Sequence, residues 1–220
     1  MNLQSWPRGP DRPIARAEVH LWRASVDQGG WSSTRSLPPA ERERAERLLH
    51  PLSRARWSAS RWALRQVLAR YLDADPVTIE LRPGERGKPA LADPAAALRF
   101  NLSHSGGLVL IALTEGREVG VDIEWVDPRR NVIALANRGL PPAKSTAIRN
   151  APPASRARAF HEAWARREAL LKCLGSGLGG PLPRARVRVS PLDVGPGYAG
   201  ALALAGHRAI PQRRFSLPAA

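Results

Sequence analysis

The sequence contains a single cysteine, Cys173, in 220 residues. No disulfide can therefore form within the chain, which is typical of proteins that work in a reducing compartment. No apolar run reaches the roughly 20 residues that cross a bilayer. Residues 1–13 also lack the apolar segment of a secretory signal. These absences predict a cytoplasmic protein with no membrane partner.

Lysine and the smaller aromatics are scarce too: the chain has three phenylalanines, two tyrosines and the lysines Lys88, Lys144 and Lys172. Arginine therefore carries most of a net charge of +15. Such a charge attracts nucleic acids, phosphorylated cofactors or acidic proteins, although arginine-rich, alanine-rich sequences also arise from GC-rich genomes. A nucleic-acid surface usually interleaves aromatic side chains with arginines. With so few aromatics in such positions, we do not expect nucleic acid to be the partner.

Hydrophobic periodicity predicts most of the helices and strands. Leu64, Val67, Leu68 and Tyr71 recur at helical spacing, which defines the buried stripe of a helix, and Pro51 should interrupt the helical stretch before it. We expect helix over 41–72 with a break near 50–51, short helices and a mobile loop over 127–158, helix over 159–174, and strands over 18–22, 77–81, 97–103, 108–114, 118–124, 185–189 and 200–204.

Helices followed by strands occur twice along the chain. This order favours an α+β fold of two similar halves, which we place at residues 1–107 and 108–220. Residues 115–117 fit a hairpin connection between two of the strands. The sequence has no Cys/His cluster for zinc and no Walker or Rossmann glycine pattern, and no Ser-His-Asp triad is evident.

Two carboxylates lie on one predicted strand. Residues alternate between the faces of a strand, so Asp122 and Glu124 share one face while Val121 and Ile123 share the other. Like charges held close together are unfavourable unless a cation lies between them, and hard oxygen ligands suit Mg²⁺. Read alone, the pattern also fits a half-exposed strand whose acidic residues face water.

A second candidate group lies on the helix over 159–174. Trp164, Glu168 and Lys172 are four residues apart and so share one side of the helix. Glu168 could be a third metal ligand or a general base, with Lys172 on a phosphate. The plainer alternative is a surface ion pair between Glu168 and Lys172 beside a packed tryptophan.

A third group closes the strand over 97–103. Asn101, Ser103, His104 and Ser105 lead into a glycine turn, and their hydroxyl, imidazole and backbone N–H groups could cradle a phosphate. A lone histidine in this position is more often structural or simply exposed.

Taken together, these segments resemble the 4′-phosphopantetheinyl transferase superfamily, specifically its monomeric Sfp-type branch. The resemblance covers roughly residues 40–205. Its motifs, in order, are Gly87-Lys88-Pro89, Asn101-x-Ser103-His104-Ser105, Gly120-Val121-Asp122-x-Glu124 and Trp164-x-x-Arg167-Glu168-Ala169-x-x-Lys172. Two departures stand out: Arg167 replaces the usual lysine, and residues 128–158 lack the family's usual aromatic pair and acidic residue, which concerns carrier docking.

The resemblance implies transfer of the 4′-phosphopantetheine group of coenzyme A to a serine of an acyl or peptidyl carrier protein, with release of adenosine 3′,5′-bisphosphate. It implies a pseudo-twofold monomer with its active site in the cleft between the halves, the first half binding the nucleotide. The expected partner is an acidic carrier protein, drawn to the basic surface. The implied roles are Mg²⁺ ligation by Asp122, Glu124 and Glu168, catalysis by Glu168 and Lys172, and coenzyme A binding by Arg44, Arg61, Lys88, Ser103 and His104.

Three alternatives stay open from the sequence. The chain could keep the fold with lost or very selective activity, it could be a basic nucleic-acid-binding protein, or the same carboxylates could serve a metal-dependent phosphodiesterase. The carrier and its pathway are not specified by any motif.

Overall fold

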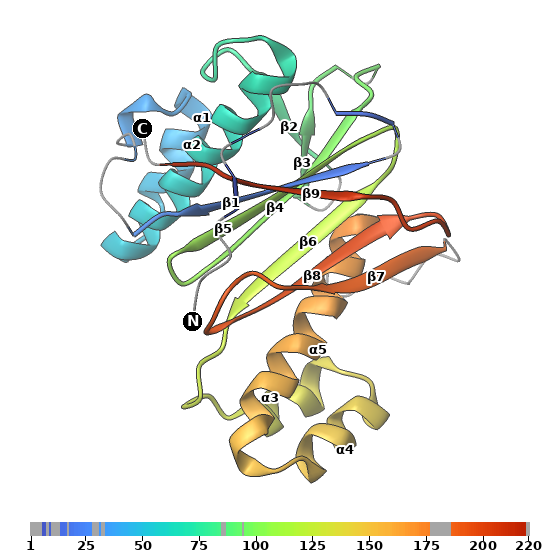
Figure 1. The fold of residues 1–220 in the computed structure, drawn as a ribbon. Coiled ribbons are helices and arrows are strands. Elements are labelled where there is room, and N and C mark those ends of the chain that lie inside the picture. The colour runs from blue at the N-terminus through green and yellow to red at the C-terminus, as the bar shows by residue number, and fades with distance from the viewer. Residues whose placement is uncertain are drawn as a thin grey trace.

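The structure is a computed structural model that describes residues 6–7, 9, 14–16, 18–27, 31, 34–84, 87–93, 95–176 and 186–218 (Figure 1). Most of the entry segment over 1–16, the glycines at 177–180 and the start of the strand expected at 185 lie outside these residues.

The first half begins with strand β1 (Val19–Ser25) and a short 3₁₀ turn, η1 (Thr34–Ser36). Two helices follow. α1 spans Pro39–Glu46 and α2 spans Pro51–Leu72, each with proline in its first turn, where the missing N–H is not needed. The predicted break near residues 50–51 is confirmed. α2 ends at Asp73 in the left-handed conformation, a common helix terminus.

The first sheet has the strand order β4-β5-β1-β9. β5 pairs antiparallel with both β4 and β1, whereas β9 runs parallel to β1 along its other edge. A separate small hairpin, β2–β3, lies above this sheet in Figure 1. The bounds are β2 Leu81–Pro83, β3 Pro89–Leu91, β4 Leu98–Ser105, β5 Leu108–Glu115 and β9 Gln212–Ser216.

The second half repeats the plan with a three-stranded antiparallel sheet of order β6-β8-β7. Two short helices, α3 and α4, precede the long helix α5, which ends at Gly175 with φ 64°. The bounds are β6 Val119–Trp125, α3 Val132–Gly139, α4 Pro142–Asn150, α5 Pro153–Leu174, β7 Val187–Leu192 and β8 Tyr198–Ala205.

The two halves correspond element by element. In the first, strand β1, the 22-residue helix α2 and the β4–β5 pair give the order β4-β5-β1; in the second, β6, the 22-residue helix α5 and the β7–β8 pair give β7-β8-β6. The predicted α+β fold of two similar halves is confirmed.

Strand alternation divides the core into layers. On β1, Trp22 packs towards α2 while Leu21 packs towards the second sheet; on β8, Leu202 faces the first sheet while Ala203 faces α5. The layers therefore run α2, first sheet, second sheet, α5. Because β6 contributes Val119, Val121 and Ile123 to the apolar layer between the sheets, its intervening residues face α5.

The hairpin predicted between residues 108–114 and 118–124 is wrong. β5 pairs with β4 and β1, and β6 begins the other sheet. The sheets thus change between β5 and β6, whereas a boundary at residues 107 and 108 cuts the β4–β5 hairpin. Pairing of this kind depends on residues far apart in sequence, which local alternation does not reveal.

Two other expectations need correction. Residues 76–78 form a turn, and strand β2 begins only at Leu81, so the strand expected over 77–81 is wrong. In this turn the Asp75 side chain accepts a hydrogen bond from the Val77 amide (2.8 Å), and the Asp75 carbonyl accepts one from the Thr78 amide (3.0 Å). Strand β9 was not predicted at all. The short helices expected within 127–158 are present as α3 and α4, and α5 begins six residues before 159.

None of the described helices combines the length and the apolar character needed to span a membrane.

Candidate active site

Strand β6 and helix α5 bring the predicted carboxylates to one place because Gly120 lets the helix approach closely. A side chain at Gly120 would collide with the backbone of Ala169 and Cys173. The face of β6 that carries Asp122 and Glu124 therefore lies directly against the turns of α5 that carry Glu168 and Lys172.

Asp122 is the buried centre of the site, with 2% of its surface exposed. Its Oδ1 accepts hydrogen bonds from Lys172 Nζ (2.5 Å) and Ser103 Oγ (2.8 Å), and Lys172 also donates to Ser103 Oγ (3.0 Å). Burial raises the pKa of Asp122 above its usual value, although the Lys172 charge opposes this. Asp122 Oδ2 is buried and has no hydrogen-bond partner among the described residues.

In Glu124 and Glu168, as in Asp122, the surroundings disfavour the charged form of the carboxyl group. Burial, followed by repulsion from Asp122, raises the pKa of Glu124 to about 7 and raises that of Glu168 above its usual value. Glu168 Oε1 is buried without a hydrogen-bond partner in the described part of the chain. Repulsion from Asp122 acts on both glutamates, and the charge of Lys172 offsets it only in part, so the group of carboxylates favours a further cation.

The donor set fits a hard divalent cation. Unpaired, buried oxygens on Asp122 and Glu168 are the kind of ligand that Mg²⁺ takes. In the present arrangement, however, no three acidic, histidine or cysteine side chains of the described residues enclose a metal position. The Lys172 ammonium, bonded to Asp122 Oδ1, instead supplies the local positive charge.

Strand β4 lies beside β6 and is joined to it by side chains. Asn101 Oδ1 accepts from the Val121 amide (2.8 Å), and Ser105 Oγ accepts from the Trp125 amide (2.9 Å) while donating to Glu124 Oε2 (3.4 Å). These contacts join the first sheet to the strand that carries the carboxylates. Ser103, expected to bind a phosphate, uses its hydroxyl on Asp122.

A cleft of about 620 Å³ opens next to this cluster. It is lined by all five residues predicted to bind coenzyme A and by both residues predicted to be catalytic, namely Arg44, Arg61, Lys88, Ser103, His104, Glu168 and Lys172. They come from α1, α2, the β2–β3 connection, β4 and α5, and the structure brings them together. Asp122 and Glu124 are not among the lining residues; Asp122 lies behind Ser103 and Lys172.

The charged groups of the cleft differ in how far they are already paired. The Arg44 and Arg61 guanidinium groups lie 5.8 and 5.9 Å from the Trp57 ring centroid, within cation–π range. Lys88 donates to Glu118 (2.7 Å) and to the Val119 carbonyl (3.0 Å). For His104, desolvation in the cleft, then the charges of Lys172 and Arg56, lower the imidazole pKa, which favours the neutral ring.

Comparison with known proteins identifies the family. Residues 118–215 match the family model described as 4′-phosphopantetheinyl transferase superfamily, and residues 20–116 match 4′-phosphopantetheinyl transferase, N-terminal. The 4′-phosphopantetheinyl transferase HetI of a Nostoc species is 35% identical over 81% of this chain and 78% of its own length. The chain belongs to the 4′-phosphopantetheinyl transferase superfamily.

Other relatives carry the same name. The 4′-phosphopantetheinyl transferase AcpT of Escherichia coli K12 is 37% identical over 70% of this chain and 74% of its own length. The L-aminoadipate-semialdehyde dehydrogenase-phosphopantetheinyl transferase of Rattus norvegicus is 30% identical over 76% of this chain and 58% of its own length. The chain is thus a phosphopantetheinyl transferase, and the two family models divide it where the sheets change between β5 and β6.

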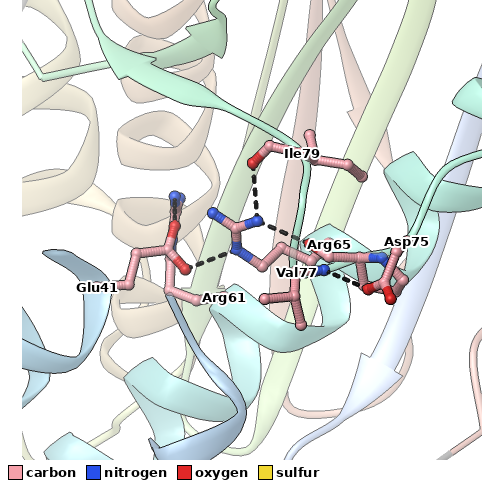
Figure 2. Close-up of polar contacts among 7 residues, drawn as sticks. Glu41, Arg61, Arg65, Asp75, Val77 and Ile79 are labelled. Atoms are coloured by element: carbon pink, nitrogen blue, oxygen red, sulfur yellow. Dashed lines mark hydrogen bonds and ion pairs between the residues drawn. The ribbon is translucent and has the colours of Figure 1, made fainter. Parts of the chain in front are cut away.

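In this phosphopantetheinyl transferase, sequence reasoning missed Glu41, a cleft residue that binds Arg61 of the cleft and its neighbour Arg65. Glu41, 12% exposed at its side chain, accepts hydrogen bonds from Arg61 and, at 2.8 Å, from Arg65 (Figure 2). Arg65 also donates to the carbonyls of Pro76 and Ile79. Arginines at i and i+4 of α2, with an acidic residue in the preceding helix, were the available signal.

Replacing Glu41 with glutamine is expected to lower the free energy of unfolding by about 2 kcal/mol at pH 7, less than the full loss of a buried partner because the amide still accepts a hydrogen bond. Burial alone would raise the pKa of Glu41, but hydrogen bonds and charge from Arg65 and Arg61 outweigh it and lower the pKa. A depressed carboxyl pKa stabilises the fold above the unfolded-state pKa, and this stabilisation is lost as the pH falls through the folded-state pKa.

The measurement is urea denaturation at pH 7 and in steps below pH 4.5, with Glu43→Gln as the control. Glu43 belongs to the same helix but forms an exposed pair with Arg47 at 3.7 Å, worth little. The difference between wild type and Glu41→Gln should shrink towards acid pH. If the difference in free energy of unfolding stayed constant across the pH range, the stabilisation would not come from the negative charge of Glu41.

Proposed function

We propose that the enzyme transfers 4′-phosphopantetheine from coenzyme A to a serine of an acidic acyl or peptidyl carrier protein, releasing adenosine 3′,5′-bisphosphate, with Mg²⁺ as cofactor. The observation that carries the proposal is the adjacency of two features: a cleft lined by Arg44, Arg61 and Lys88, and a buried group of carboxylates with Lys172 at its edge.

The cleft suits the nucleotide end of coenzyme A. Guanidinium groups bind phosphates through several directed N–H donors, and Arg44 and Arg61 present theirs over Trp57. The neutral ring that the lowered pKa of His104 favours can donate one hydrogen bond and accept another. These groups place the pyrophosphate next to Lys172 and Glu168, which line the same cleft.

The reaction forms a bond between the carrier serine Oγ and the phosphorus that bears pantetheine. The bond from that phosphorus to the bridging oxygen of the pyrophosphate breaks, and the electron pair leaves with adenosine 3′,5′-bisphosphate. Glu168 lines the cleft beside Lys172 and takes the serine proton as general base. Lys172 offsets charge on the phosphate under attack.

Asp122, Glu124 and Glu168 would hold the Mg²⁺, which supplies charge neutralisation on the pyrophosphate oxygens. Ser103 and Ser105 fix the orientation of Asp122 and Glu124 from β4. We also propose that the enzyme acts as a monomer in the cytoplasm, since one chain already contributes both walls of the cleft.

The test is intact mass spectrometry of a panel of purified apo acyl and peptidyl carrier proteins, incubated with the enzyme, coenzyme A and Mg²⁺. We expect a mass gain of one phosphopantetheine on at least one carrier, lost with EDTA and restored by excess Mg²⁺. Absence of any gain together with absence of coenzyme A binding by calorimetry would overturn the proposal. A mass gain of the carrier that persists in EDTA would show that the reaction does not need Mg²⁺.

A further inference from the structure

A second pocket, of about 460 Å³, lies between α3 and α5 and shares no lining residue with the cleft described above. Phe160, His161 and Trp164 of α5 form its aromatic wall, and Glu124 lines it from β6. Gly139 lets the Trp164 ring pack directly against the end of α3.

Three arginines of this pocket are not bound directly to any carboxylate of the described residues, although the charges of Arg130 and Arg167 oppose the raised pKa of Glu124 and of Glu168, respectively. Arg130, Arg138 and Arg167 all line the pocket, yet within the described ranges their side chains make no hydrogen bond or ion pair. Arg130 and Arg138 are exposed, whereas Arg167 Nε is buried and lacks a partner. A buried donor without an acceptor is costly, so the pocket favours an anionic group.

His161 adds a requirement for a hydrogen-bond donor. Its ring is fully buried, and Nδ1 donates to the Ala157 carbonyl (2.7 Å), since a carbonyl can only accept. Nε2 then carries a lone pair and has no partner in the described structure. A polypeptide offers a carboxylate together with amide N–H donors, whereas a fully ionised phosphate offers acceptors alone.

The position of the pocket assigns it to the acceptor substrate. Neighbours on α5 line different cavities: Glu168 lines the cleft, and Arg167 lines the pocket. The carboxylate group therefore lies between the two. Phosphoryl transfer places the attacking and leaving oxygens roughly in line, so an acceptor would approach from the side opposite the nucleotide.

We propose that the pocket between α3 and α5 binds an acidic side chain of the carrier protein close to its acceptor serine, through Arg130, Arg138 and Arg167. The proposal rests on the proposed function and adds the residues that recognise the acceptor. It also gives a role to the segment 128–158 and to Arg167, the two places where the chain departs from its family's pattern.

The experiment uses the double variant Arg130→Ala/Arg138→Ala and an apo acyl carrier protein that the wild-type enzyme modifies. Both arginines are exposed, so the variant should fold normally. Loss of two charge-assisted contacts should raise the KM for the carrier by about tenfold or more, with the KM for coenzyme A unchanged. Fluorescence anisotropy of labelled apo carrier, without coenzyme A, should show the same loss of affinity. The control is Arg166→Ala, which removes an exposed arginine of α5 that does not line the pocket and forms no ion pair with any other described residue.

The outcomes separate this inference from the proposed function. Carrier affinity should be restored in the variant Arg130→Lys/Arg138→Lys, which keeps both charges. The alanine variant should also lower affinity less for a carrier whose acidic residues near the serine are changed to amides. Both results would support the proposed role of the pocket. Unchanged carrier affinity in the alanine variant, with wild-type transfer intact, overturns the inference alone. A raised KM for coenzyme A with unchanged carrier affinity assigns the pocket to phosphopantetheine and also overturns it. If the wild type neither modifies any carrier nor binds coenzyme A, both proposals fall.

Discussion

Changing Glu168 to glutamine is expected to reduce the rate of phosphopantetheine transfer by about 1,000-fold, within the range of general-base catalysis. Glutamine has nearly the same shape but cannot take the serine proton or supply an anionic metal ligand. Because Glu168 Oε1 has no partner among the described residues, no hydrogen bond of the fold is lost. Single-turnover kinetics with apo carrier protein, coenzyme A and Mg²⁺ measure the rate.

Glu162→Gln is the matched control for this change. Glu162 lies on the same helix and forms a partly exposed i,i+4 pair with Arg158, so its loss should change neither rate nor stability appreciably. If Glu168→Gln retains more than a tenth of the wild-type rate, Glu168 is not the group that accepts the serine proton. Calorimetry should show coenzyme A binding in both variants, which separates binding from chemistry.

Changing Gly120 to alanine is expected to lower the free energy of unfolding by about 3 kcal/mol, the upper part of the range for overpacked cores. The added methyl group would collide with the Ala169 carbonyl and the Cys173 amide, which belong to the helix backbone and cannot rotate away. α5 must then move off β6. Asp122 would separate from Lys172, so transfer activity should fall even in the folded fraction.

Gly116→Ala serves as the control, because it adds the same methyl group in open space at φ 70°. Its expected cost of about 1 kcal/mol comes from the left-handed backbone alone. Thermal and urea unfolding of the two variants provide the comparison. Equal stabilities would show that the close approach of β6 and α5 is not the constraint assigned here.

The local part of this fold was predictable from residue patterns. Proline at the start of α2 and Gly175 at the end of α5 mark helix limits through backbone chemistry that operates within a few residues. The two-residue period of β6 likewise assigned Asp122 and Glu124 to one face and Val121 to the other. Each of these properties is set by residues close together in the chain, so a local sequence pattern is enough to predict it.

Pairings between distant segments were not predictable in the same way. β9 returns to lie parallel to β1, and β6 pairs with β8 rather than with β5. Where a strand was expected from residue 77, Arg65 of α2 instead donates hydrogen bonds to the carbonyls of Pro76 and Ile79. These arrangements come from long-range contacts, for which the sequence carries no periodic signal.

The candidate site shows the same division. Residue types and order in the sequence identified the family and named seven of the residues that line the cleft. That the Ser103 hydroxyl donates to Asp122 follows only from β4 lying beside β6. That Arg130, Arg138 and Arg167 converge on one pocket follows only from the packing of α3 on α5. Sequence determined which chemical groups are available; the tertiary structure decided which of them meet, because burial and packing act between residues that the chain order keeps apart.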